Sequence, residues 1–188
     1  MQDILYPALI CIKGDDEMFL EAIIISVIIG FIRRGSLRGF KRLNKLTALL
    51  FVVGLVIQYM LGTLDQLAES NSLDLIMKYS KPIQILSYIL IFIGIFTNIK
   101  FKSLWAVLVG YIFNFLSIAT NNWIMPNLIG EEVEGAKLAV LGKTIQFFEP
   151  YPFPKVLSLG DLIIAFGIFS LIQEIMLEKD SNSYSFKL

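Results

Sequence analysis

The stretch Ser-Leu-Gly-Asp at residues 158–161 stands directly before an apolar run, and its acid is the first candidate for chemistry in this chain. Ser158 and Asp161 are spaced to accept hydrogen bonds from the free N–H groups of a helix start, where a carboxylate also meets the positive end of the helix dipole. At the boundary of a membrane helix, the same carboxylate could instead bind a cation, a proton or a partner's base. Both interpretations of Ser158, Gly160 and Asp161 are open.

A second group of candidates lies about forty residues earlier. Asn121, Met125 and Pro126 begin a long polar loop, and 158–161 closes it. We expect these two loop ends to meet, because apolar runs flank the loop on both sides. Any chemistry outside the apolar runs is expected here.

Polar residues also occur within or near the apolar runs. Glu21 is either interfacial or paired inside a bundle with Lys143 or Asn121. Glu174 is expected to snorkel or to pair with Arg33 or Arg34. Three amides are expected to make interhelical hydrogen bonds of about 1 kcal/mol or less: Gln58, Gln84 and Asn114.

Composition excludes more functions than it supports. The chain has 188 residues, of which 56% are hydrophobic and 17% are charged, whereas soluble domains are about 25% charged. It has no histidine and one cysteine, which excludes histidine-based catalysis, histidine-bound zinc and cysteine metal clusters. The zero net charge argues against nucleic acid as a partner. No cofactor or metal site is indicated, and the bilayer is the expected partner.

The elements that must position these residues are five apolar helices of an all-α, polytopic membrane protein. The predicted spans are residues 18–34, 46–62, 82–98, 104–120 and 159–177. Residues 1–17 form an outer extension, 121–158 an ordered outer loop, and 178–188 a tail. Within the connectors we expect an amphipathic surface helix in 63–81, Pro82 in a first helical turn, a short helix in 131–141 and an extended path at 150–154.

Charge sets the orientation of these spans. The first connector carries six positive and no negative residues, and the turn at 99–102 is also basic. Because basic loops stay in the cytoplasm, the N-terminus is expected outside and the C-terminus inside. The basic residues of the first connector are interpreted as orientation determinants or as ligands of anionic lipid headgroups: Arg33, Arg34, Arg38, Lys41, Arg42 and Lys45.

Several motifs resemble one family of bacterial multi-pass membrane proteins, catalogued as a domain of unknown function (five-three-one-seven). Residues 18–21 and 29–35 resemble its start. Asn-Asn-Trp-Ile-Met-Pro at 121–126 resembles its Asn-Gly-Gly-x-Met-Pro stretch, and 158–161 matches its Ser-x-Gly-Asp motif. The resemblance implies the fold, a cell-membrane location and a natural start at Met18, but no activity.

Two positions depart from the family pattern. The family usually has Gly-Gly where this chain has Asn122 and Trp123. It usually has an acid where this chain has Lys143, after Leu141 and Gly142. The second departure argues against a role that requires two aspartates on the outer face.

Three functions remain open at this point. The first is an accessory or structural subunit of a membrane complex, with membrane protein partners. The second is a small transporter component, which would need ionisable residues in the middle of spans. The third is a membrane enzyme that acts on a lipid-linked substrate at the outer face through Asp161, Glu21 and Lys143. We expect the first, and no catalytic residue is assigned.

Overall fold

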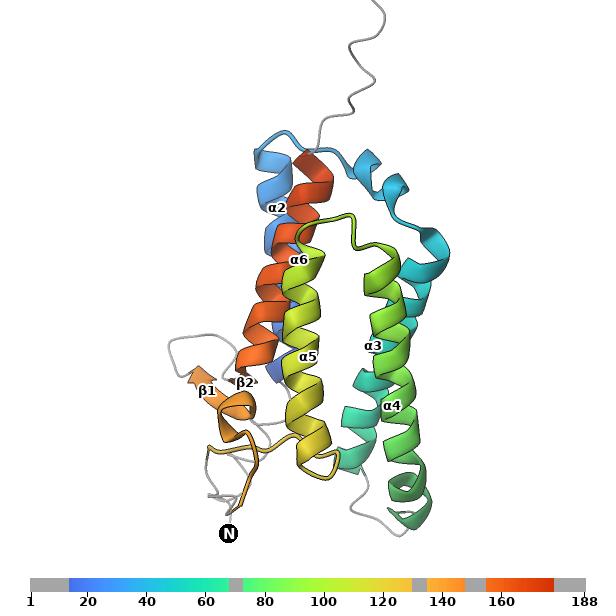
Figure 1. Ribbon diagram of the computed structural model, residues 1–188. Helices are drawn as coiled ribbons and strands as arrows, with labels where there is room; N and C mark the ends of the chain where they lie inside the picture. Colours follow the sequence, from blue (N-terminus) through green and yellow to red (C-terminus); the bar gives the residue numbers. More distant parts are fainter. Residues whose placement is uncertain (1–13, 68–72, 130–134, 148–154, 178–188) are drawn as a thin grey trace, which may run out of the picture.

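The computed structural model describes residues 14–67, 73–129, 135–147 and 155–177, and most of these residues are helical (Figure 1). Helices α5 and α6 have the bounds of the last two predicted spans. The elements are α2 (Gly14–Ile32), the 3-10 helix η1 (Leu37–Arg42), α3 (Lys45–Leu67), α4 (Leu73–Thr97), α5 (Leu104–Thr120), the 3-10 helix η2 (Ala139–Leu141), β1 (Lys143–Phe147), β2 (Lys155–Ser158) and α6 (Leu159–Leu177).

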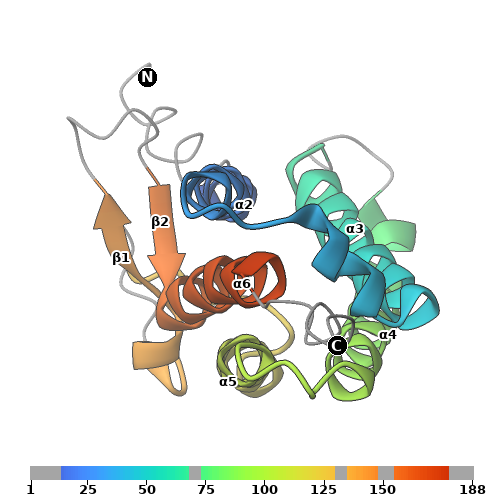
Figure 2. The ribbon, with the colours of Figure 1, turned by 90° about the horizontal axis from the view of Figure 1, so that it is seen from above.

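The α-helices run side by side in two groups. Helix α6 packs between α2 and α5, and α3 pairs with α4 (Figure 2). Segment η1 crosses one end of the bundle and contacts α6. This end, which also holds the α4–α5 turn, is called the basic end below (Figure 1). The two strands and η2 lie at the opposite end, called the hairpin end.

Three helices are longer than the predicted spans. Helix α3 runs to Leu67 and α4 begins at Leu73, so the separate surface helix expected in 63–81 is wrong: its described residues, 63–67 and 73–81, belong to the two neighbouring helices. Pro82 lies inside α4 rather than in its first turn, at a cost of about 3 kcal/mol relative to alanine. Helix α2 begins at Gly14, where the acidic residues that follow suit a helix N-terminus.

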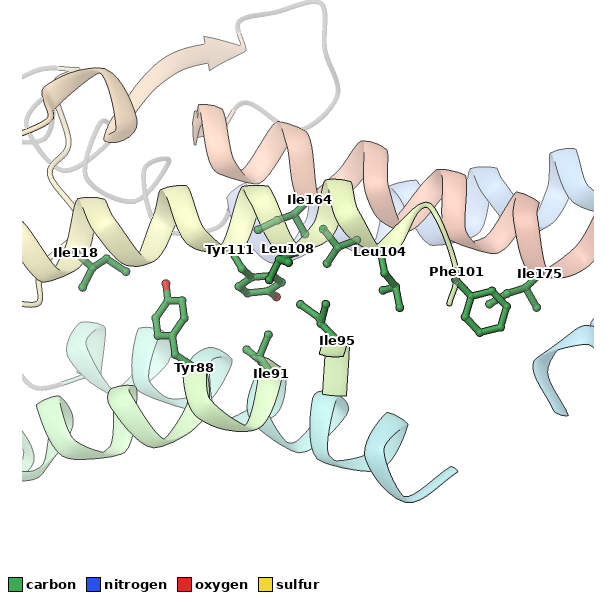
Figure 3. Packing of buried hydrophobic residues seen from close by; sticks show 11 residues of the cluster. Tyr88, Ile91, Ile95, Phe101, Leu104, Leu108, Tyr111, Ile118, Ile164 and Ile175 are labelled. Carbon is green, nitrogen blue, oxygen red and sulfur yellow. The ribbon is translucent and has the colours of Figure 1, made fainter. Parts of the chain in front are cut away.

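The apolar core lies where α4 and α5 face one another (Figure 3). The Tyr88 ring stands edge-on to two rings of α5, with its centroid 5.3 Å from Phe115 and 6.3 Å from Tyr111. Such edge-to-face pairs add about 0.5–1.5 kcal/mol each to the burial of their area. The other buried members of the cluster are Ile91, Ile95, Phe101, Leu104, Val107, Leu108, Ile118, Ile164 and Ile175.

Glycine allows α5 and α6 to approach closely. A Cβ on Gly110 would stand 2.7 Å from the carbonyl oxygen of Gly160, and a Cβ on Gly160 would stand 2.8 Å from that of Gly110. The two residues therefore form one reciprocal contact, as small residues do between membrane helices. The sequence shows no GxxxG spacing here, because the partners lie on different helices.

The long loop contains a hairpin that the sequence analysis did not predict. Strands β1 and β2 pair antiparallel. The helix expected in 131–141 is wrong where the loop is described: only η2 is helical. Gly135 (φ 86°) and Leu138 (φ 51°) both have left-handed backbones, which a right-handed helix cannot continue. Residues 130–134 and the predicted extended path at 150–154 lie outside the described residues.

Candidate functional site

Ser158 and Asp161 cap the start of α6 reciprocally. The backbone N–H of Asp161 donates to Ser158 Oγ at 3.0 Å, and the backbone N–H of Ser158 donates to Asp161 Oδ2 at 2.9 Å. This is the geometry of a capping box, with aspartate in the place of the usual glutamate. The capping interpretation of these residues is therefore what the geometry shows.

Asn114 of α5 completes the cluster from a neighbouring helix. Its Nδ2 donates to Asp161 Oδ1 at 2.7 Å, and its Oδ1 accepts from Ser158 Oγ at 2.9 Å. Asn114 thus makes the interhelical hydrogen bonds expected of it. Gly160 gives the amide its room, since a Cβ there would collide with Asn114 Oδ1.

The cluster of Asn114, Ser158 and Asp161 is closed and shielded from solvent. Ser158 is fully buried, and Asp161 is 5% exposed. Each carboxylate oxygen of Asp161 already accepts one hydrogen bond, and the Ser158 hydroxyl both donates and accepts. A buried carboxylate held this way is stabilised by its donors, and its remaining lone pairs are shielded from solvent.

Asn121 fastens the start of the loop. Its Nδ2 donates to the carbonyl oxygens of Ser117 and Lys137, both at 2.7 Å, and its Oδ1 accepts from the backbone N–H of Lys137 at 2.9 Å. The side chain therefore joins the end of α5 to the middle of the loop. The Asn121 amide both donates to and accepts from the backbone of Lys137, as a paired strand residue would.

The two ends of the loop meet at Lys143. The backbone N–H of Lys143 donates to the carbonyl of buried Pro126 at 2.8 Å. Lys143 also stands opposite Ser158 in the hairpin. Met125 packs against the apolar core. Both loop ends therefore lie beside Lys143, in a strand that the sequence analysis missed.

Comparison with known proteins identifies the group to which this fold belongs. Residues 40–129 and 127–173 match the family described as "Family of unknown function (DUF5317)". The chain belongs to this family. Both loop motifs, at 121–126 and 158–161, lie within the matched residues. No curated protein and no solved structure matches the chain.

The backbone of this DUF5317 chain is left-handed at the two positions where the resemblance described above leads us to expect Gly-Gly. Asn122 (φ 55°) and Trp123 (φ 68°) both adopt left-handed backbones, which favour glycine. They end α5 tightly, with the N–H of Trp123 bonded to the carbonyl of Ile118 at 2.9 Å. The Trp123 ring lies 5.9 Å from Phe115 and 5.6 Å from Lys81 Nζ. The chain thus makes this left-handed turn without glycine at either position.

At the basic end, the last turn of α6 holds three other segments. Gln173 donates to the carbonyl oxygen and to the hydroxyl of Ser26 in α2, and it accepts from Arg33 Nη1 at 3.2 Å. The carbonyl of Met176 accepts from the backbone N–H of Ser36 at 2.8 Å. The carbonyl of Ile175 accepts from Arg42 Nη2 at 3.3 Å. Basic groups are favourable here, since a helix C-terminus carries partial negative charge.

Glu174 caps the N-terminus of α5. Its two carboxylate oxygens accept from the backbone N–H groups of Lys102 and Ser103, each at 2.9 Å. The pairing expected with Arg33 or Arg34 is wrong: Arg33 donates to Gln173 instead. The antiparallel packing of α5 and α6 places this carboxylate at the positive N-terminal end of α5. In the sequence, the basic turn before α5 was the only signal of this cap.

Glu21 lies in α2, the helix that contacts β2. One of its carboxylate oxygens is buried. Asn121, one of its two expected partners, directs its amide to Ser117 and Lys137. The structure therefore brings together Asn114, Ser158 and Asp161 and separately Asn121 and Lys137. Glu21 lies at the hairpin end of α2.

Proposed function

We propose that this chain is an integral membrane protein with five spans and that it serves as an accessory or structural subunit of a membrane complex. Its helices α2 to α6 cross the cell membrane of a bacterium, with the basic end in the cytoplasm and the hairpin end outside. The bundle would support partner subunits through its helix faces rather than act on a substrate.

Helix dimensions support the five spans. Two helices are long and apolar enough to cross a membrane by length and composition, namely Tyr79–Thr97 and Leu159–Leu177, and three further apolar helices are shorter. As complete helices, α2 to α6 have 17 to 25 residues, which is the range of transmembrane helices. Only 28% of Tyr79–Thr97 is buried, whereas the core helix of a soluble protein is mostly buried.

Outward-facing side chains support a lipid environment for the shorter helices as well. Large apolar side chains are exposed along whole faces of α2, α3, α4 and α5, at a density that a monomeric soluble protein rarely shows. Examples of these side chains are Ile24, Ile28, Leu49, Val56, Leu86, Ile93, Val109 and Ile112.

The closed state of the Asp161 cluster is the observation that carries the structural role. Both oxygens of this buried carboxylate are occupied by bonds that cap α6 and join it to α5. The membrane-enzyme alternative needs Asp161 to face a substrate. The transporter alternative needs ionisable groups along a path through the spans. In both, a substrate or ion would have to reach Asp161, whose side chain is buried.

Native mass spectrometry of the tagged chain, extracted from its own membrane in mild detergent, tests this role. We expect a complex with a second protein in fixed stoichiometry. Single tryptophan substitutions on exposed faces, Ile24→Trp in α2, Val56→Trp in α3 and Val109→Trp in α5, should locate the partner. One face should lose the complex, and the other two serve as matched controls. Detection of the chain only as a monomer, without a second protein, would contradict the proposal.

A further inference from the structure

The basic residues at the basic end divide into two sets. Three of them hold the fold: Arg33 donates to Gln173, Arg42 donates to the carbonyl of Ile175, and Lys100 Nζ donates to the carbonyl of Arg42 at 2.6 Å. Five others have exposed side chains, for which no hydrogen bond or ion pair is found among the described residues. These five form the basic rim: Arg34, Arg38, Lys41, Lys45 and Lys102.

The rim stands on a fixed platform. Segment η1 starts at the cap of Ser36, whose Oγ accepts from the backbone N–H of Arg38 at 3.2 Å. Gly39 packs directly on the carbonyl of Ile175, with no room for a Cβ. Phe40 packs against the core. The side chains of Arg38 and Lys41 are therefore presented outward from a segment that is held on its other side.

Exposed apolar side chains adjoin the rim. Ile32 at the end of α2 is 74% exposed, Leu37 of η1 is 51% exposed, and Leu46 at the start of α3 is 68% exposed. Each stands within two residues of a rim or neighbouring basic residue in the chain. This alternation of apolar and cationic side chains fits the level of a bilayer where acyl chains give way to phosphates.

Within the described part of this end, acidic charge reaches the rim only at Lys102, which lies beside Glu174. The carboxylate of Glu174 is directed at the backbone N–H groups of Lys102 and Ser103. We propose that the basic rim binds the headgroups of anionic phospholipids in the leaflet at the basic end. This inference rests on the proposed membrane insertion and adds the class of lipid and the residues that select it.

The two tryptophans allow a direct test, because Trp105 lies in the first turn of α5 at the basic end and Trp123 lies beyond the last turn of α5 at the hairpin end. Trp105 is 58% exposed. The full chain carrying Trp123→Phe is placed in phosphatidylcholine vesicles that contain a minor fraction of acyl-brominated phosphatidylglycerol or, for comparison, of acyl-brominated phosphatidylcholine. Bromine quenches the fluorescence of a tryptophan that it contacts.

We expect brominated phosphatidylglycerol to quench Trp105 about twofold more strongly than brominated phosphatidylcholine at low salt, with the difference reduced at high salt. The variant Arg38→Gln/Lys41→Gln/Lys45→Gln should lose the difference. The matched variant Lys81→Gln/Lys137→Gln, which removes charge elsewhere, should keep it. The complementary chain with Trp105→Phe reports the hairpin end, where no preference is expected.

Each failure has a distinct meaning. Equal quenching by the two lipids would overturn the rim proposal and leave the membrane proposal standing. A preference that survives the triple substitution would also overturn it, since the named residues would not be the ligands. Absence of quenching by either lipid would overturn membrane insertion and the rim proposal together. Thermal unfolding of each variant in detergent verifies that the bundle is intact.

Discussion

At the scale of single residues, the donors and acceptors of the Asp161 cluster are matched one to one. Asp161 contributes two acceptor oxygens and one backbone N–H, Ser158 one hydroxyl and one N–H, and Asn114 one donor and one acceptor. Removing one member of such a buried set leaves the others unsatisfied, which costs about 1–3 kcal/mol for each orphaned group. The stability of variants of this cluster can therefore distinguish a capping role of Asp161 from a role in binding or catalysis.

We expect Asp161→Ala to destabilise the bundle by about 2–3 kcal/mol, because Ser158 and Asn114 both lose an acceptor. The double variant Asn114→Asp/Asp161→Asn should stay within about 1 kcal/mol of the wild type. The carboxylate at position 114 can accept from the Ser158 hydroxyl and from the new amide, whose oxygen accepts from the Ser158 N–H. Thermal unfolding in mild detergent measures both changes.

The double variant also decides the role of the acid in the cell. If Asp161 only caps and joins helices, growth and complex formation should be those of the wild type. If the double variant folds but loses function, the carboxylate is needed at position 161 itself. That result would favour the enzyme or transporter alternative.

At the scale of elements, α6 organises the bundle from both of its ends. Its first turn is joined to α5 by Asn114. Its last turn binds α2 through Gln173, α5 through Glu174 and η1 through the carbonyl groups of Ile175 and Met176. A helix held at both ends in this way fixes the relative height of its neighbours.

Glu174 should contribute through its charge at the N-terminus of α5. We expect Glu174→Gln to cost about 0.5–1 kcal/mol, because one acceptor oxygen and the favourable charge at the helix end are lost. Lys102→Ala should be neutral, since Lys102 engages Glu174 through its backbone N–H. Unfolding temperatures of the two variants provide the comparison. A larger loss for Lys102→Ala would mean that a side-chain ion pair matters more than the cap.

At the scale of the whole molecule, polarity is arranged along the bundle. The η1 segment and the α4–α5 turn place cationic residues at one end, and the hairpin, η2 and Asn121 occupy the other (Figure 1). The helices between them expose apolar side chains. If the bundle inserts as proposed, these two ends must be on opposite sides of the membrane.

Labelling of intact cells by a membrane-impermeant maleimide tests this arrangement. In a Cys11→Ser background, Lys137→Cys at the hairpin end should react before permeabilisation, whereas Arg38→Cys at the basic end should react only afterwards. Both side chains are exposed, so reactivity depends on the side of the membrane rather than on burial. Labelling of both positions in intact cells would contradict the five-span topology.

Much of the architecture follows from local sequence signals. Apolar runs of span length and the Ser-x-Gly-Asp start of α6 place α5 and α6 at their observed bounds. The basic residues of the connectors 33–45 and 99–102 predict that these two connectors lie at the same end of the bundle. The hairpin was not predicted because its strands are short and their apolar and polar residues alternate weakly. The helix predicted in 131–141 was wrong because Leu138 has a left-handed backbone, which the sequence does not indicate.

Sequence alone thus located the apolar middle parts of α2 to α6 and showed how charge divides between the connectors, because hydrophobicity, caps and charge act within a few residues. Only the tertiary structure decided which polar residues meet. Asn114 lies 47 residues from Asp161, and Glu174 lies 71 residues from Ser103. A hydrogen bond across such a separation depends on the height and rotation of packed helices, which no local pattern specifies. For this reason Asp161, first a candidate for binding or capping, acquired its partners only when α5 was placed beside α6.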